Sequence, residues 1–263
     1  MRVIDLDRDM RDVIPTGTSR DTEFLFERMT NRTLDVVAAG PGRRVLDVAS
    51  GLGQDARALA ARGGLAVAAE PSSRMSELAR LQNETRGGAC PGHVRGWGDA
   101  LPFADESFNA VFCKGALDHF DAPLLAIAEM ARVTRSDGLV VLTIANFESL
   151  SCRLARGFDF WREAVLGRSL PRGRRHYDVP HDHFTRYDLG LMQEQASRYL
   201  VLEQAEGISM AWGVPFWSRM VSRLPEGMAQ RALVGLDAIS RRFPSLSDVI
   251  LLAGRPRSES KSA

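Results

Sequence analysis

Glycines and two acidic residues mark a segment that could hold a nucleoside-like ligand. Residues 45–53 are Val-Leu-Asp-Val-Ala-Ser-Gly-Leu-Gly, and Glu70 ends the next apolar run. Glycine at a strand-to-helix turn lets a ligand lie against the backbone, because a Cβ there would collide with it. A carboxylate at the end of the second strand can accept hydrogen bonds from both hydroxyls of a ribose. The pattern indicates a ribose-containing ligand near Asp47, Gly51 and Glu70.

Two classes of cofactor fit this segment when it is taken alone. Residues 51–56, Gly-Leu-Gly-Gln-Asp-Ala, satisfy the G-x-G-x-x-A pattern of dinucleotide-binding proteins, and Glu70 follows at about the expected distance. An NAD-dependent dehydrogenase is therefore one alternative. Three features stand against it: Asp47 at the strand end, a helix expected before that strand, and the segment Gly-Asp-Ala-Leu-Pro-Phe at 98–103.

Alternating strands and helices must position these residues. We expect strands at 44–48, 65–69, 94–97, 109–113, 139–145, 200–205 and 248–253. Helices are expected from 18 or 19 to 39, at 55–61, 72–86, 122–133 and 188–199, and within 216–243. This alternation is typical of βαβ units and of a parallel sheet covered on both faces. Residues 147–186 break the rhythm, and we interpret them as an insertion.

The loop at 47–53 resembles the D-x-G-x-G-x-G cofactor motif of class I S-adenosylmethionine-dependent methyltransferases, with Ala49 in place of the first glycine. Further segments resemble the branch that contains the ubiquinone and menaquinone C-methyltransferases. These segments are Gly-Asp-Ala-Leu-Pro-Phe at 98–103, Phe-Asn-Ala-Val-Phe at 108–112, Ala-Leu-Asp-His-Phe at 116–120, and Glu-Met-Ala-Arg-Val at 129–133 followed by Asp-Gly at 137–138. The resemblance covers residues 20–146, and more weakly 181–206 and 248–254.

The resemblance implies an α/β fold of the Rossmann-like type, a three-layer sandwich. Its seven-stranded, mostly parallel sheet would have the order 3-2-1-4-5-7-6, with the last strand antiparallel to the rest. We expect a single methyltransferase domain over residues 1–263. Helical insertions at 147–186 and 207–243 would cap the acceptor side.

The resemblance also implies how S-adenosylmethionine is held, with S-adenosylhomocysteine as the product. Asp47 would orient the methionine ammonium, and Glu70 would bind the ribose hydroxyls. Gly51 and Gly53 would pass beneath the cofactor together with Ala49.

Three further residues would complete the implied cofactor site. Asp99 would accept a hydrogen bond from the adenine amino group, and the backbone of Ala100 would donate one to the ring. Lys114 would lie beside the methionine moiety, although lysine is less typical at this position of the family.

Histidines and tryptophans are the candidates on the acceptor side. Methyl transfer from a sulfonium is an in-line displacement, so the protein must align donor and acceptor and, for an oxygen or nitrogen acceptor, remove a proton. His119, next to Asp118, and His183 are the candidate catalytic bases. As alternatives, His119 caps a helix or packs on the cofactor, and His183 belongs to a structural loop. The residues predicted to line the acceptor pocket are Trp161, His181 and Trp212.

The composition narrows the acceptor and the partners. Residues 147–186 hold eight arginines and five acidic residues beside several aromatic ones, which suits an acceptor with an apolar body and an anionic group. The histidines and aspartates at 176–183 could bind a divalent metal, but the resemblance implies none. A net charge of +1 gives no field for a nucleic-acid backbone.

Cellular location and partners follow from similar observations. The sequence has no apolar run long enough to span a membrane, although residues 216–243 could contact a membrane surface or a second subunit. Three cysteines without a C-x-x-C pair favour free thiols in the cytoplasm. We therefore predict a cytoplasmic enzyme that methylates a small, partly apolar molecule, such as a specialised metabolite or lipid-like precursor. A non-catalytic regulatory protein that binds S-adenosylmethionine is the alternative.

Overall fold

A seven-stranded sheet forms the centre of the molecule. The computed structural model describes residues 19–38, 40–167, 177–178 and 184–258. The strands are β1 (Arg44–Val48), β2 (Leu65–Ala69), β3 (Gly92–Val94), β4 (Phe108–Lys114), β5 (Thr134–Ala145), β6 (Leu200–Ile208) and β7 (Val249–Pro256). Their order is β3-β2-β1-β4-β5-β7-β6, and only the pairings of β7 with β5 and β6 are antiparallel. The predicted fold class and strand order are confirmed.

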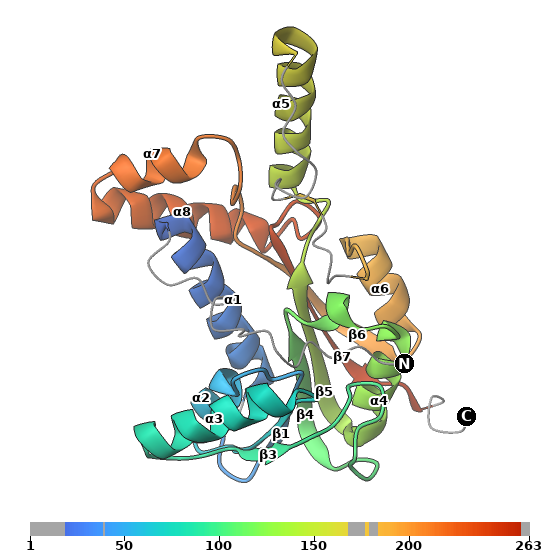
Figure 1. Ribbon diagram of the computed structural model, residues 1–263. Helices are drawn as coiled ribbons and strands as arrows, with labels where there is room; N and C mark the ends of the chain where they lie inside the picture. Colours follow the sequence, from blue (N-terminus) through green and yellow to red (C-terminus); the bar gives the residue numbers. More distant parts are fainter. Residues whose placement is uncertain (1–18, 39, 168–176, 179–183, 259–263) are drawn as a thin grey trace.

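Helices cover both faces of the sheet (Figure 1). They are α1 (Arg20–Val37), α2 (Gln54–Ala61), α3 (Ser73–Arg86), α4 (Pro123–Val133), α5 (Leu150–Leu166), α6 (Leu189–Ser197), α7 (Trp217–Arg223) and α8 (Glu226–Ser240), with a short 3₁₀ helix η2 (Leu117–His119). Buried side chains of α1 and α2 pack on one face, and those of α4 and α6 pack on the other. The central strands are apolar because neighbouring residues such as Val140 and Val141 are buried on opposite faces.

Side-chain caps fix where several helices begin. Ser72 Oγ accepts a hydrogen bond from the Met75 N–H at the start of α3, and Asp188 Oδ1 accepts one from the Leu191 N–H at the start of α6. Ser149 Oγ does the same for Cys152 N–H at the start of α5. These bonds satisfy amide groups that the first helical turn leaves without a partner.

Some predicted boundaries were wrong. The third strand was expected at 94–97, but β3 ends at Val94, because the chain then turns and Trp97 pairs with Ala100 in a short antiparallel bridge. Residues 216–243 form two helices because Pro225 lies between α7 and α8. The last strand was expected to end at residue 253, but β7 continues to Pro256, which pairs with Leu200 of β6.

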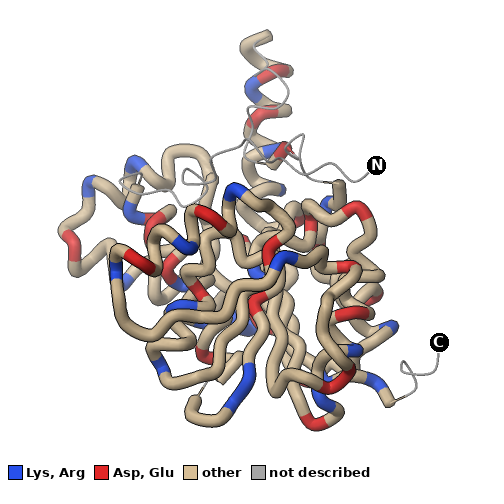
Figure 2. Tube along the Cα trace, turned by 60° about the horizontal axis from the view of Figure 1, so that its bottom comes forward, with Lys and Arg blue, Asp and Glu red and all other residues tan. Residues whose placement is uncertain are grey.

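Helices α5, α7 and α8 lie beyond the carboxyl ends of the parallel strands. In Figure 1, β5 points toward α5, which extends away from the sheet, and α7 and α8 lie on the same side. Figure 2 shows long uncharged stretches along the central strands, with charged residues of both signs on helices and loops. Within the described part of the chain, no helix is long and apolar enough to cross a membrane.

Candidate active site

The turn between β1 and α2 has a left-handed backbone at three of its five residues. The φ angles of Ala49, Gly51 and Gly53 are 57°, 52° and 65°. Glycine adopts this conformation freely, whereas alanine there costs about 1–2 kcal/mol. A Cβ on Gly53 would lie 2.9 Å from Cε1 of His93, so a side chain at this position would strain the turn and displace the His93 ring. The turn thus leaves a bare backbone at the carboxyl end of β1.

Glu70 is fixed beside this turn by two backbone amides. Its Oε2 accepts a hydrogen bond of 2.8 Å from the Gly51 N–H, and its Oε1 accepts one of 3.0 Å from the Ser72 N–H. Burial raises the pKa of the Glu70 carboxyl, and the two amides partly offset this effect. Each carboxylate oxygen can accept more than one hydrogen bond, so both retain capacity for a ligand hydroxyl.

Asp47 lies deeper, at the end of β1 and against the first turn of α2. Burial raises the pKa of its carboxyl well above the usual value, and the nearby Asp55 raises it further. Lys114 and a hydrogen bond with the Ala56 backbone act in the opposite direction. A cationic ligand group would favour the ionised form of Asp47 in the same way as Lys114 does.

Lys114 joins three elements. Its Nζ lies 2.8 Å from Oδ2 of Asp55 in α2 and donates a 2.6 Å hydrogen bond to Thr30 Oγ1 in α1. The side chain is mostly buried. In this arrangement Lys114 ties α1 and α2 to the end of β4. Sequence reasoning did not identify Thr30 or Asp55 as its partners.

Asp99 and Ala100 lie in the turn that follows β3. The Ala100 N–H already donates to the Trp97 carbonyl, so the predicted donation to an adenine ring would compete with this bond. A Cβ on Gly98 would lie 2.6 Å from Cε2 of Phe120, which brings the turn close to η2. Glu129 of α4 also fixes the turn, because its Oε2 accepts a 2.8 Å hydrogen bond from the Leu101 N–H.

His119 ends η2, just beyond β4. Its Nε2 lies 3.9 Å from Oδ1 of Asp118, whose side chain is buried, while 32% of the histidine side chain is exposed. The Asp118 carbonyl also accepts hydrogen bonds from the N–H groups of Phe184 and Thr185. The imidazole of His119 thus lies partly exposed beside a buried carboxylate.

The two candidate tryptophans differ in their surroundings. Trp212 is half-buried, and its Nε1 donates a 3.0 Å hydrogen bond to Thr22 Oγ1 at the start of α1. Trp161 lies on the outer half of α5, with 54% of its surface exposed, and its ring contacts that of Phe158 at a tilt of 35°. Phe158 in turn makes an edge contact with Phe216, which joins α5 to the segment before α7.

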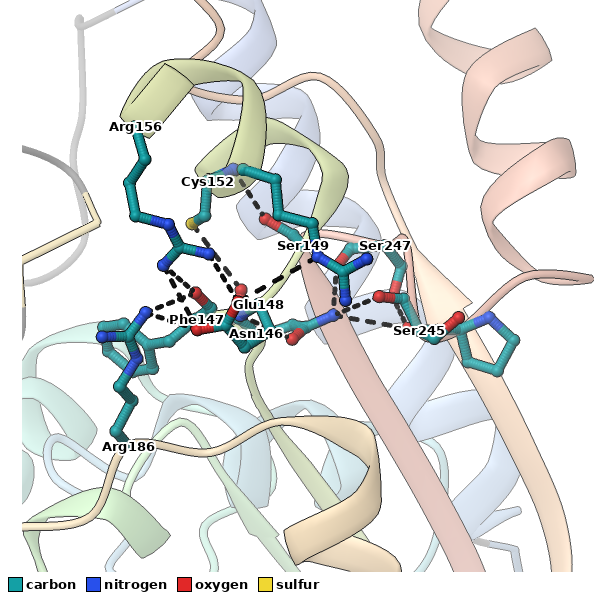
Figure 3. A network of polar contacts seen from close by, with 11 residues as sticks. Asn146, Phe147, Glu148, Ser149, Cys152, Arg156, Arg186, Ser245 and Ser247 are labelled. Atoms are coloured by element: carbon teal, nitrogen blue, oxygen red, sulfur yellow. Dashed lines mark hydrogen bonds and ion pairs between the residues drawn. The ribbon is translucent and has the colours of Figure 1, made fainter. Parts of the chain in front are cut away.

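A network of polar contacts attaches α5 to the sheet (Figure 3). Asn146 Nδ2 donates to the carbonyls of Ser245 and Ser247, and its Oδ1 accepts from the Glu148 N–H. Arg156 and Arg186 both form ion pairs with Glu148. These contacts hold the first turn of α5 against the sheet, and no sequence motif indicates this network.

Asp248, just before β7, joins the two insertions. Its carboxylate accepts hydrogen bonds from Ser151 Oγ of α5, from Ser209 Oγ and from the Trp212 N–H, at 2.6, 3.2 and 3.0 Å. Burial raises the pKa of this carboxyl to about 6. A lone acidic residue before a strand carries no clear signal, so the sequence alone did not identify it.

His181 and His183 lie outside the described residues, and their predicted roles remain predictions. For the other predicted residues, the structure brings Asp47, Glu70 and Lys114 together around the first turn. It places Asp99 and His119 on the neighbouring loops.

Comparison with known proteins shows which domain family and which fold this chain resembles. Residues 46–142, from β1 into β5, match the family model of a methyltransferase domain. A chain from the Haloferax volcanii complex between the Trm112 methyltransferase activator and a methyltransferase has the same fold, with a TM-score of 0.59, 18% identity and coverage of 90% of this chain and 93% of that one. The protein has the fold of the class I S-adenosylmethionine-dependent methyltransferases.

Within that class the chain resembles the menaquinone-type branch. It is 35% identical over 164 residues to the demethylmenaquinone methyltransferase of Mycobacterium sp. (strain KMS). The aligned residues cover 62% of this chain and 65% of that protein. The matching enzyme of Renibacterium salmoninarum is 35% identical over 131 residues, half of either chain. The match thus spans less than two thirds of these relatives' own length. Phosphoethanolamine N-methyltransferase 2 of Haemonchus contortus, solved with S-adenosyl-L-methionine, shares the fold, with a TM-score of 0.55, 16% identity and coverage of 87% of this chain and 52% of that one.

Proposed function

We propose that the chain is an enzyme that transfers a methyl group from S-adenosylmethionine to a small, partly apolar acceptor of the quinone type. The observation that carries the proposal is the position of Glu70, whose carboxylate is held against the bare turn by Gly51 and Ser72. The 35% identity to demethylmenaquinone methyltransferases supports the acceptor class.

The residues at the turn fit this cofactor better than a dinucleotide. A pyrophosphate would bind the free amides at the start of α2, as in dinucleotide-binding folds. Here the Asp47 carboxylate already bonds to the Ala56 backbone, and Asp55 adds a second negative charge in the same turn. Carboxylates at this point suit an ammonium and a ribose, and they repel phosphates.

The chain's own residues would hold and orient the two reactants. When bound, S-adenosylmethionine supplies an electrophilic methyl group on a sulfonium. Asp47 would hold the ammonium and Glu70 the ribose hydroxyls, while Asp99 would accept from the adenine amino group. A quinol-type acceptor loses one proton overall, and His119 is the residue that we propose accepts it, with Asp118 stabilising the resulting charge.

The insertions would form a cap over the acceptor. We propose that residues 147–186 and the segment that follows β6, residues 209–243, enclose the sulfonium side of the crevice. The Phe158–Phe216 contact and the three hydrogen bonds to Asp248 support this, because they join the two insertions. Trp212 would contribute apolar surface, and exclusion of water would strengthen the alignment of donor and acceptor.

Calorimetry and a transfer assay test the proposal in turn. We expect S-adenosylmethionine and S-adenosylhomocysteine to bind, NAD not to bind, and a labelled methyl group to appear on a short-chain demethylmenaquinol analogue. Glu70→Ala serves as the inactive control. Binding without labelling of any acceptor in a metabolite extract would favour the non-catalytic alternative, and binding of NAD alone would refute the proposal.

A further inference from the structure

The outer half of α5 exposes apolar side chains that no other part of the described chain covers. Its first turns are anchored, with Ser151, Cys152 and Ala155 buried. Beyond them Phe160 is 77% exposed, and Trp161, Val165 and Leu166 are each more than half exposed. Figure 1 shows this half of the helix extending away from the rest of the molecule.

These side chains surround the helix and do not form a single stripe. At about 100° per residue, Phe160, Trp161, Val165 and Leu166 point in directions spread over about 240° of the circumference. Arg162, which pairs with Asp159, and the exposed Glu163 lie among and opposite these side chains. A partner helix would need a narrow apolar stripe, whereas apolar side chains spread this widely and mixed with charged ones suit the interfacial region of a bilayer, where the charges reach the headgroups. A large exposed apolar surface on a folded protein marks an interaction site.

A second exposed surface lies at the start of α7. Phe216 is 67% exposed and Met220 is half exposed. Phe216 also has a φ of 68°, a conformation that costs a bulky residue energy and is kept where the surroundings or function require it. The only charged residues between positions 209 and 224 are Arg219 and Arg223, and both are exposed. Apolar side chains beside basic ones are typical of helices that lie at a membrane surface.

We propose that the outer half of α5 and the start of α7 form one docking surface for a lipid bilayer with anionic headgroups. The Phe158–Phe216 contact, with ring centroids 6.0 Å apart, joins the two parts. Both lie beyond the carboxyl ends of the strands, on the side of the cofactor turn (Figure 1). Docking would present the acceptor side of the crevice to the bilayer. The purpose of docking rests on the proposed function, because an apolar acceptor would be drawn from the lipid phase.

Vesicle flotation of the full chain tests docking without cofactor or acceptor. We expect binding to vesicles of mixed phosphatidylcholine and phosphatidylglycerol and much weaker binding to phosphatidylcholine alone. Arg219→Glu/Arg223→Glu should reduce binding to the mixed vesicles by about thirtyfold or more. Phe160→Ser/Val165→Ser should reduce it by at least about tenfold.

Matched controls lie on other elements: Arg44 begins β1, Arg86 ends α3, Leu81 lies on α3 and Val201 lies on β6. Arg44→Glu/Arg86→Glu makes the same change in charge, and Leu81→Ser/Val201→Ser removes exposed apolar side chains, so both should bind as the unmodified chain does. All variants should keep their affinity for S-adenosylhomocysteine, which shows that they are folded. Equal losses in the controls, no vesicle binding at all, or a dimer in light scattering that Phe160→Ser/Val165→Ser dissociates would each overturn the proposal. A failed transfer assay with intact vesicle binding would refute the proposed function and leave the docking surface standing.

Discussion

The proposed donor side and the proposed acceptor side of the crevice fix their polar side chains through contacts of very different sequence separation. Glu70 is held by amides 19 and 2 residues away. Asp248 and Asn146 are held by groups up to 97 and 101 residues away, at Ser151 and Ser247. The donor side is therefore built largely from one βαβ unit, whereas the acceptor side depends on strands and insertions assembled from the second half of the chain. Loss of a contact should affect mainly cofactor binding on the first side, and cap assembly on the second.

The largest effect should come from Glu70→Ala. The variant loses two hydrogen bonds to a charged acceptor, so the Kd for S-adenosylhomocysteine should rise at least about a hundredfold in calorimetry. Glu84→Ala, which removes an exposed carboxylate on α3, is the matched control and should bind normally. If the affinity of Glu70→Ala were unchanged, Glu70 would not hold the ribose.

Asp248→Asn should alter the pH dependence of stability. Because the pKa of Asp248 is about 6 in the folded chain and 3.8 for an ordinary aspartate, its contribution is fully present below pH 3.8 and is lost as pH rises through 6. The difference corresponds to about 3 kcal/mol. Urea unfolding from pH 4 to 7 should therefore show a flatter profile for Asp248→Asn than for the unmodified chain. Burial also raises the pKa of Glu70 and of Asp47, and both groups affect the pH dependence of stability equally in the variant and in the unmodified chain. Stability profiles with the same slope for the two proteins would therefore contradict the role of Asp248.

His119 lies where the two sides meet, and its substitution separates catalysis from binding. His119→Ala should lower kcat by about a hundredfold, in the range of lost general-base catalysis, while the Kd for S-adenosylhomocysteine changes little. Added imidazole should restore part of the activity. Equal loss of affinity and turnover, without rescue, would instead make His119 a residue that packs against the cofactor.

The smallest effect should come from the aromatic contact between the insertions. Phe158→Leu loses an edge contact worth about 1 kcal/mol, so the KM for the acceptor should rise about fivefold with cofactor affinity unchanged. Phe103→Leu loses a similar contact with Phe108 outside the insertions and is the matched control. A KM that rises equally in both variants would show that the contact with Phe216 does not shape the cap.

The amino-acid sequence determined the succession of strands and helices, the turn after β1 and the position of Glu70, whereas the order of the strands in the sheet was expected only from the family resemblance. Apolar periodicity, glycines and helix caps act over a few residues, so they can be recognised without knowledge of the fold. Even here the third strand was misplaced, because the bridge between Trp97 and Ala100 draws the chain out of the sheet.

Only the tertiary structure decided how the acceptor side is built. The partners of Asp248, of Asn146 and of Lys114 come from distant elements, and no local pattern encodes such contacts. The same holds for α5, where the sequence showed an insertion with aromatic residues but not which ones stay exposed. Trp161 was predicted to line a pocket, yet it lies with Phe160 on the outer half of the helix. Burial is a property of the assembled molecule, because it depends on which other elements reach a side chain, and here none of those described covers the end of α5.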